Sequence, residues 1–154
     1  MKLLTFSNPK TLKGEAAGYL TAILHLSPAN LSGYEVCQWR TKGCTAGCLN
    51  TAGRGGMFRE GGTNAIQEAR KARTKMLFEH WADFAIQLRL ELRSMERKAA
   101  RLGLKPAVRL NGTSDLPWET YNFMGSQNIF EAFPRIMFYD YTKSHGRSFR
   151  HAIG

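Results

Sequence analysis

The chain has few cysteines and few histidines, which limits the chemistry that it can carry. Of its 154 residues, three are cysteine and four are histidine. An odd number of thiols does not form a disulfide framework, and the N-terminal stretch MKLLTFSNPK lacks the apolar length and the cleavage site of a signal peptide. We therefore expect reduced thiols that bind a metal or act as a nucleophile.

Long apolar runs and several recognition motifs are also absent from the sequence. No segment approaches the roughly 20 apolar residues needed to span a bilayer, so we expect no membrane association. No helix-turn-helix, zinc-finger or RNA-recognition signature is visible, and no Gly-Lys-Ser/Thr follows the glycine-rich segment. The sequence therefore does not indicate a P-loop nucleotide-binding protein.

Acidic residues are scarce relative to basic ones. The chain has 12 Asp and Glu against 22 Lys and Arg, a formal net charge of +10. Much of this charge falls in EARKARTK and RLELRSMERKAARLG, within one expected helix that includes Arg93, Arg97 and Arg101. A solvated helix face explains this pattern, and so does a surface that binds nucleic acid or a host protein.

Hydrophobic patterning predicts a single α/β domain over residues 1–154. Strands are expected at 2–7, 18–28, 107–112 and 135–141, with a short helix at 128–133. This βαβαβ order favours a small, mostly parallel, partial-barrel-like sheet. Such a sheet leaves an edge open, and we expect a second copy of the chain or the N-terminal strand to cover that edge.

One long helix is expected between Asn64 and Gly103. Asn64 and Gln67 form a capping-box pattern, and Gly103 is a typical residue after a helix C-terminus. A straight helix of this length would extend roughly 60 Å, which exceeds the width of so small a domain. The helix is therefore predicted to be kinked or broken.

The three cysteines lie in a predicted metal loop, residues 37–57. Cys37, Cys44 and Cys48 are separated by six and three residues, a spacing that can wrap an inorganic centre. We favour an iron–sulfur cluster, [4Fe-4S] or [3Fe-4S]. In a four-iron cluster, the fourth iron would bind water, substrate, Asp115 or His25.

Two alternatives to a cluster remain open. Zinc could be held by the three cysteines and a distant histidine, although no CxxC pair or closely spaced histidine pair is present. A cysteine could instead act as a nucleophile with a histidine as its base; the candidate bases are His25, His80, His145 and His151.

Further pocket residues are expected next to the cysteines. In TAGRGGM, Arg54 could add positive charge, and the backbone around Gly55 could approach a cluster or an anion. Polar side chains also follow two strands, and strand ends of a parallel sheet meet at one edge. These candidates are Asn111, Thr113, Ser114, Asp115, Trp118 and Glu119 after one strand, and Asp140 and Lys143 after the other. A basic tail, 144–154, follows.

Three separated motifs carry a resemblance to a known family. LSPANLSGYEVCQWRTKGCTAGCLNTAGRGGM, VRLNGTSDLPWE and FYDYTK together resemble the Gene product 88 family of bacteriophage proteins. This resemblance implies a viral protein that acts in the cytoplasm of the infected bacterium. The order of strand, cysteine loop and helix is also similar to radical S-adenosylmethionine enzymes, which implies S-adenosylmethionine as a cofactor; their usual cysteine spacing is three and then two residues.

Three functions follow from these patterns. The first is an iron–sulfur protein with an open coordination position that performs redox or Lewis-acid chemistry on a small substrate. The second is a binding protein in which the metal is structural and the basic helix contacts nucleic acid or a host protein. The third is a thiol enzyme. The sequence leaves open whether the protein is a catalyst.

Overall fold

A computed structural model describes residues 1–6, 9–51, 53–58, 61–62, 64–144 and 146–147 of the chain. The elements follow one another in the order β1 (Leu4–Thr5), α1 (Pro9–Ala16), β2 (Tyr19–Leu24), α2 (Lys42–Ala46), η1 (Leu49–Thr51), η2 (Gly53–Gly56), α3 (Ala65–Glu79), α4 (Trp81–Leu102), β3 (Lys105–Arg109), η3 (Trp118–Thr120), α5 (Ile129–Ala132) and β4 (Met137–Phe138). The predicted α/β class is confirmed.

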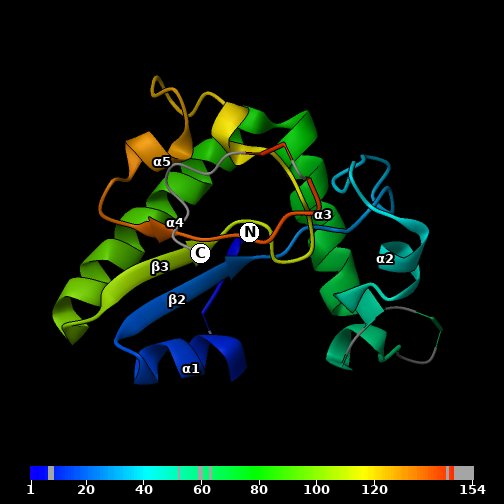
Figure 1. Ribbon diagram of the computed structural model, residues 1–154, viewed down its shortest axis with the longest axis horizontal. Coiled ribbons are helices and arrows are strands. Elements are labelled where there is room, and N and C mark those ends of the chain that lie inside the picture. The colour runs from blue at the N-terminus through cyan, green and yellow to red at the C-terminus, as the bar shows by residue number, and fades with distance from the viewer. Residues whose placement is uncertain (7–8, 52, 59–60, 63, 145, 148–154) are drawn as a thin grey trace.

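The four strands form one open sheet in the order β1-β2-β3-β4 (Figure 1). β2 pairs in parallel with β3, and β3 with β4, but β1 is antiparallel to β2, with Leu4 opposite Leu24. The sheet is therefore mixed, and the prediction of a mostly parallel sheet was wrong. The described strands also do not close into a barrel.

The N-terminal strand β1 covers one edge of the sheet, beside β2. The predicted alternatives were this strand or a second copy of the chain. Glu91 of α4 accepts hydrogen bonds from the backbone N–H groups of Leu3 at 2.8 Å and Leu4 at 2.7 Å, which further fixes β1. Pairing with a second copy through the β4 edge stays a prediction.

The predicted long helix is broken at His80. The backbone of His80 has φ −138° and ψ 55°, so α3 ends and α4 begins on either side of it. Asn64 caps α3 by accepting from the N–H groups of Ile66 and Gln67, and Gly103 ends α4 with a left-handed φ of 66°. The predicted break and both predicted helix ends are thus confirmed.

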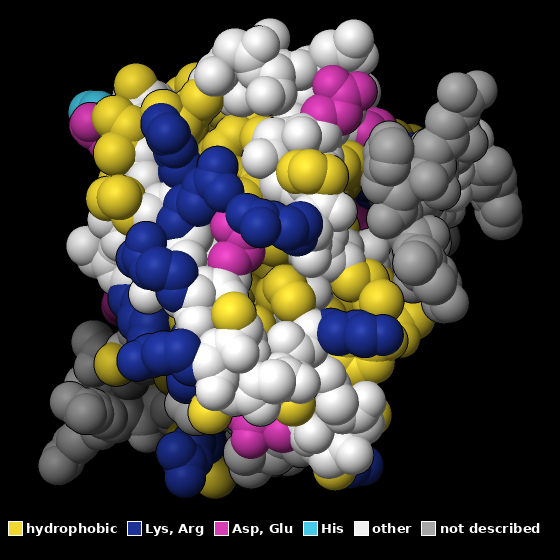
Figure 2. Space-filling view, turned by 90° about the vertical axis from the view of Figure 1, so that its left-hand side faces the viewer, with side chains coloured by type: hydrophobic (Ala, Val, Ile, Leu, Met, Phe, Trp, Pro, Cys, Tyr) yellow, Lys and Arg dark blue, Asp and Glu magenta, His cyan; other side chains and the backbone are white. Residues whose placement is uncertain are grey.

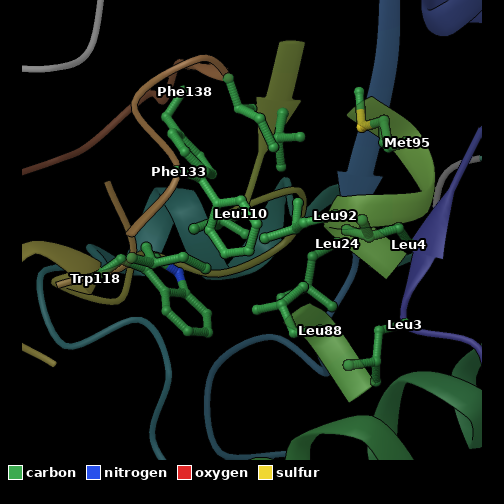
Figure 3. Close-up of a cluster of buried hydrophobic side chains, with 14 of the residues drawn as sticks. Leu3, Leu4, Leu24, Leu88, Leu92, Met95, Leu110, Trp118, Phe133 and Phe138 are labelled. Atoms are coloured by element: carbon green, nitrogen blue, oxygen red, sulfur yellow. The ribbon is translucent and has the colours of Figure 1, made fainter. Parts of the chain in front are cut away.

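The hydrophobic core lies between α4 and the sheet (Figure 3). Leu88, Leu92 and Met95 of α4 are buried against Leu4 of β1 and Leu24 of β2. Each fully buried aliphatic side chain contributes roughly 1.5–3 kcal/mol, so this contact is a main source of stability. α1 contacts the other side of β2.

None of the helices in the described ranges is long and apolar enough to cross a membrane.

Candidate functional site

A cavity of about 380 Å³ opens where the parallel strands end, and all three cysteines line it. Its wall is built by the cysteine loop, the turn after β3 and the segment after β4. The predicted residues in this wall are Cys37, Cys44, Cys48, Thr113, Ser114, Asp115 and Lys143. The volume is typical of a small-molecule site, roughly 300–1,000 Å³.

Cys37 is half-buried between the loop after β2 and the turn after β3. Its Sγ accepts a hydrogen bond from the Ala29 backbone N–H at 3.4 Å and lies 3.9 Å from the Thr113 carbonyl oxygen. Burial raises the pKa of the Cys37 thiol, and the Ala29 N–H only partly offsets this effect. Without a metal, Cys37 is therefore a protonated thiol at neutral pH and a poor nucleophile.

Cys44 lies on the short helix α2, and Cys48 follows that helix. Thr41 caps α2 and accepts from the Cys44 N–H at 3.1 Å. A second hollow of about 280 Å³ is also lined by all three cysteines. The thiols thus border two hollows and are not enclosed in a packed interior.

Two arginines place positive charge beside the thiols. Arg40 forms an ion pair with Glu35 at 2.8 Å, which raises the pKa of its guanidinium, and Cys37 and Cys44 raise this pKa further once they are ionised. Arg70 is buried, and its Nη1 donates to Asn50 Oδ1 at 2.7 Å. Burial lowers the pKa of Arg70, whereas the nearby Cys48 raises it.

The three thiols are free, but they are not grouped as ligands of a single metal ion. All three cysteines are free of disulfides and partly exposed. Within the residues that the structure describes, no three His, Cys, Asp or Glu side chains are grouped closely enough to bind one ion.

Asn111 organises the turn after β3 instead of lining the cavity. Its Oδ1 accepts hydrogen bonds from Ser114 Oγ at 2.8 Å, Leu116 N–H at 3.0 Å and Trp118 Nε1 at 3.1 Å. Its Nδ2 donates to the Leu116 carbonyl oxygen and to Asp140. Trp118 is buried in the core with 1% of its surface exposed, so it does not present a stacking face.

Asp115, Glu119 and Asp140 surround one arginine from the C-terminal tail. Arg147 Nη1 lies 2.7 Å from Asp115 Oδ1 and Arg147 Nη2 lies 2.8 Å from Glu119 Oε2, while Asp140 is 3.9 Å away. The Arg147 side chain is only 5% exposed. Burial raises the pKa of Asp140 to about 6, although hydrogen bonds from Asn111 and the Tyr141 N–H act against this shift.

The predicted glycine loop lies apart from the described lining of the cavity. Asn64 Nδ2 donates to the carbonyl oxygens of Arg54 and Gly55, and Gln67 Nε2 donates to Gly55 at 2.7 Å. These bonds fold the loop as η2 against the start of α3. Gly55 packs against Asn50, and the Arg54 side chain is exposed.

Sequence reasoning missed Arg147 and Arg109. Arg147 was part of an expected basic tail, of which the structure describes residues 144, 146 and 147; His145 and His151 lie outside the described residues. No local signal marks Arg147, because the two acidic side chains that it contacts most closely, Asp115 and Glu119, are distant in sequence. Arg109, in contrast, is a charged residue inside the apolar run AVRL, and it lines the cavity.

A separate basic hollow of about 370 Å³ lies beside the C-terminal half of α4. Arg93, Arg97 and Arg135 line it together with Glu96, which pairs with Arg93 at 3.1 Å and with Arg135 at 3.7 Å. We call this surface the α4 groove. Figure 2 shows Lys and Arg side chains gathered on this side of the molecule around an acidic group.

Comparison with known proteins identifies a family but no characterised relative. The family model described as Gene product 88 matches residues 2–153. No curated protein matches the chain, and no solved structure does.

Proposed function

The chain belongs to the Gene product 88 family of bacteriophage proteins, and on that premise we propose that it is a viral iron–sulfur protein of the infected cell's cytoplasm. Cys37, Cys44 and Cys48 would hold the cluster. The observation that carries this proposal is that every thiol of the chain lines one cavity at the carboxyl ends of the parallel strands. Ligands of α/β sheets typically bind at such an edge.

The protein's own groups suit this role. The Ala29 N–H donates to Cys37 Sγ, and N–H groups directed at ligating sulfurs stabilise their negative charge. Arg40 and Arg70 add positive charge near the thiols. Three cysteines leave one coordination position of a four-iron cluster for another ligand, and a bound cluster would supply electron transfer or Lewis-acid activation.

Asp115 and His25 were the protein groups expected to compete for that open position. The Asp115 carboxylate accepts from Arg147 Nη1 at 2.7 Å and from the Lys143 N–H at 2.9 Å. A carboxylate so engaged is a poor additional iron ligand. His25 is not among the described residues that line the cavity. Water or a small substrate is therefore favoured at the open position.

Anaerobic purification followed by iron and sulfide analysis tests the cluster. We expect a brown protein that absorbs near roughly 400 nm and carries acid-labile sulfide. Cys37→Ala, Cys44→Ala and Cys48→Ala should each lose iron while retaining helical circular dichroism. Thr45→Ser, a control variant on the same short helix as Cys44, should retain its iron. A colourless protein with stoichiometric zinc, or iron content that does not respond to the cysteine variants, would contradict the proposal.

S-adenosylmethionine chemistry is a narrower form of this proposal that rests on the similarity in layout. An assay for reductive cleavage of added S-adenosylmethionine by the iron-loaded protein tests this narrower proposal. The thiol-enzyme alternative is disfavoured for Cys37, because burial raises the pKa of its thiol instead of lowering it.

A second candidate function is nucleic-acid binding at the α4 groove, and the charge of that groove favours it. Arg93 and Arg97 are one helical turn apart, and Arg135 reaches the same hollow from the segment before β4. Only one acidic side chain, Glu96, is among the described lining residues. Arginines grouped in this way can neutralise successive phosphates.

Titration of a labelled DNA duplex and a labelled single-stranded RNA against salt tests this second function. Affinity should fall steeply with salt, with a log–log slope of roughly −0.9 per phosphate contact on the duplex. Arg93→Glu, Arg97→Glu and Arg135→Glu should each weaken binding, whereas Lys75→Glu on α3 should change it little. Salt-independent binding, or equal losses in all four variants, would contradict a nucleic-acid groove and leave a host protein as the partner to seek.

A further inference from the structure

The cavity beside the cysteines contains two cationic side chains that form no ion pair with any described acidic side chain. Its charged lining residues are Arg40, Arg109, Lys143 and Asp115. Arg40 is paired with Glu35, and Asp115 is paired with Arg147. In the described part of the chain, neither Arg109 nor Lys143 forms an ion pair, which leaves a formal excess of two positive charges.

Arg109 also has unused hydrogen-bonding capacity. It is the last residue of β3, and its guanidinium carbon lies 4.8 Å from the centre of the Tyr141 ring, which orients the guanidinium plane. Its Nε is buried, and no described group accepts a hydrogen bond from it. A buried donor without an acceptor is unfavourable, and an acidic ligand would remove that penalty.

Lys143 approaches the same space from the segment after β4. Its backbone N–H is held by Asp115 Oδ2 at 2.9 Å, whereas its side chain is exposed and lines the cavity. One carboxylate that could compete for Arg109 is Asp140, because the charge of Arg109 acts to lower the pKa of Asp140. Asp140 already accepts from Asn111 and from the Tyr141 N–H, and it does not share the described lining of this cavity.

We infer that Arg109 and Lys143 form an oxyanion-binding subsite, and that the small molecule taken by the cavity carries a carboxylate or a phosphate group. The planar guanidinium matches either group with two parallel hydrogen bonds, and the lysine supplies a second charge. The opening toward the cysteines leaves the rest of the ligand beside the thiols. The role of this ligand as a substrate rests on the proposed cluster, but the subsite itself does not.

Binding of inorganic phosphate and of malonate, measured by calorimetry at low ionic strength, tests the subsite. Arg109→Gln and Lys143→Gln should each weaken binding of the preferred anion by about tenfold, the loss expected for one charge-assisted hydrogen bond. The anion affinity of Arg109→Lys should lie between those of wild type and Arg109→Gln. Lysine keeps the positive charge but cannot donate two parallel hydrogen bonds as the guanidinium does. The tighter-binding probe identifies the ligand as a carboxylate or a phosphate.

Lys75→Gln is the matched control, because Lys75 is exposed on α3 and lines neither this cavity nor the α4 groove. Its binding of both anions should equal that of wild type. Absence of binding by wild type, unchanged affinity in both test variants, or an equal loss in Lys75→Gln would overturn the inference. If circular dichroism shows that Arg109→Gln does not fold, anion binding by Lys143→Gln alone decides the outcome, because Lys143 is exposed.

The same titration should be made on iron-loaded and on metal-free protein, with iron content read from absorbance. Anion binding that survives in both forms and responds to Arg109 supports the subsite whether or not a cluster is found. Iron loading that depends on the cysteines, together with no anion binding, would overturn the subsite and retain the cluster.

Discussion

Asp140 is buried at a position where its ionisation is unfavourable. Its folded-state pKa is about 6, against an ordinary value of 3.8, and burial is the main cause. The folded protein therefore binds this proton more tightly than the unfolded chain does. The resulting stabilisation is fully present below pH 4 and is lost as the pH rises through about 6, a change of about 3 kcal/mol.

We predict that Asp140→Asn removes this component of the pH dependence. The variant should be less stable than wild type at all pH values, because Asn111 Nδ2 and the Tyr141 N–H donate to different oxygens of Asp140 and asparagine has only one. The difference in the free energy of unfolding between the two proteins should nevertheless shrink as the pH rises from 4 to 7. Urea unfolding across this range measures it.

Glu131→Gln provides the control, since Glu131 is exposed on α5. The difference in the free energy of unfolding between Glu131→Gln and wild type should not vary across the same pH range. Carboxyl-carbon NMR gives an independent measurement, in which Asp140 should titrate near pH 6. A midpoint near pH 4 would contradict the assignment.

At the scale of elements, Gly112 allows the turn after β3 to pack directly against β2. Its N–H donates to the Leu24 carbonyl oxygen at 2.9 Å. A Cβ at this position would lie 2.6 Å from that oxygen and 2.6 Å from Ile23 Cγ2. The Leu24 carbonyl belongs to a buried strand and cannot move away cheaply.

We therefore expect Gly112→Ala to lower the free energy of unfolding by about 1–3 kcal/mol, as overpacking does. Because the same turn carries Thr113, Ser114 and Asp115, the variant should also bind iron less well. Gly43→Ala, whose new Cβ would lie 3.9 Å from its nearest neighbour, should be neutral or slightly stabilising. Equal urea midpoints for the two variants would argue against the close approach.

The elements that could be predicted from sequence are those with strong local signals. Asn64 and Gly103 marked the ends of the long helix, and its length alone required the break that occurs at His80. α1 and α2 were missed because both are short and polar: α2 has five residues and none of them is buried. The direction of β1 was not predictable, because pairing across an edge leaves no pattern within a two-residue strand.

The location of the candidate site could be predicted from the sequence, but the contacts of its side chains could not. We expected the segments that follow parallel strands to meet at one edge of the sheet. The cysteine loop, the turn after β3 and the segment after β4 do line one cavity there. That expectation could not separate Asn111, which is fully buried and shapes the turn, from Thr113, which faces the cavity. Polar side chains that build a turn and polar side chains that bind a ligand look alike in a sequence.

At the scale of the whole molecule, Arg147 joins parts of the chain that are far apart in sequence. Its guanidinium contacts Asp115 and Glu119 of the turn after β3, approaches Asp140 after β4, and lies 5.7 Å from the Trp39 ring centre in the cysteine loop. Asp115 and Asp140 are 11% and 10% exposed. Without Arg147, Asp115 would lose its ion pair, and Asp140 would keep only the charge of Arg109.

We predict that Arg147→Ala lowers the free energy of unfolding by roughly 3–5 kcal/mol, the cost of removing one partner from a buried ion pair. Arg147→Lys should lose less, because the ammonium keeps the charge but cannot reach Asp115 and Glu119 with the same two-sided geometry. Arg135→Ala, at an exposed arginine in the α4 groove, should change stability by less than about 0.5 kcal/mol. If urea unfolding gave the same small change for Arg147→Ala as for Arg135→Ala, Arg147 would not be what holds the tail against the two strand ends.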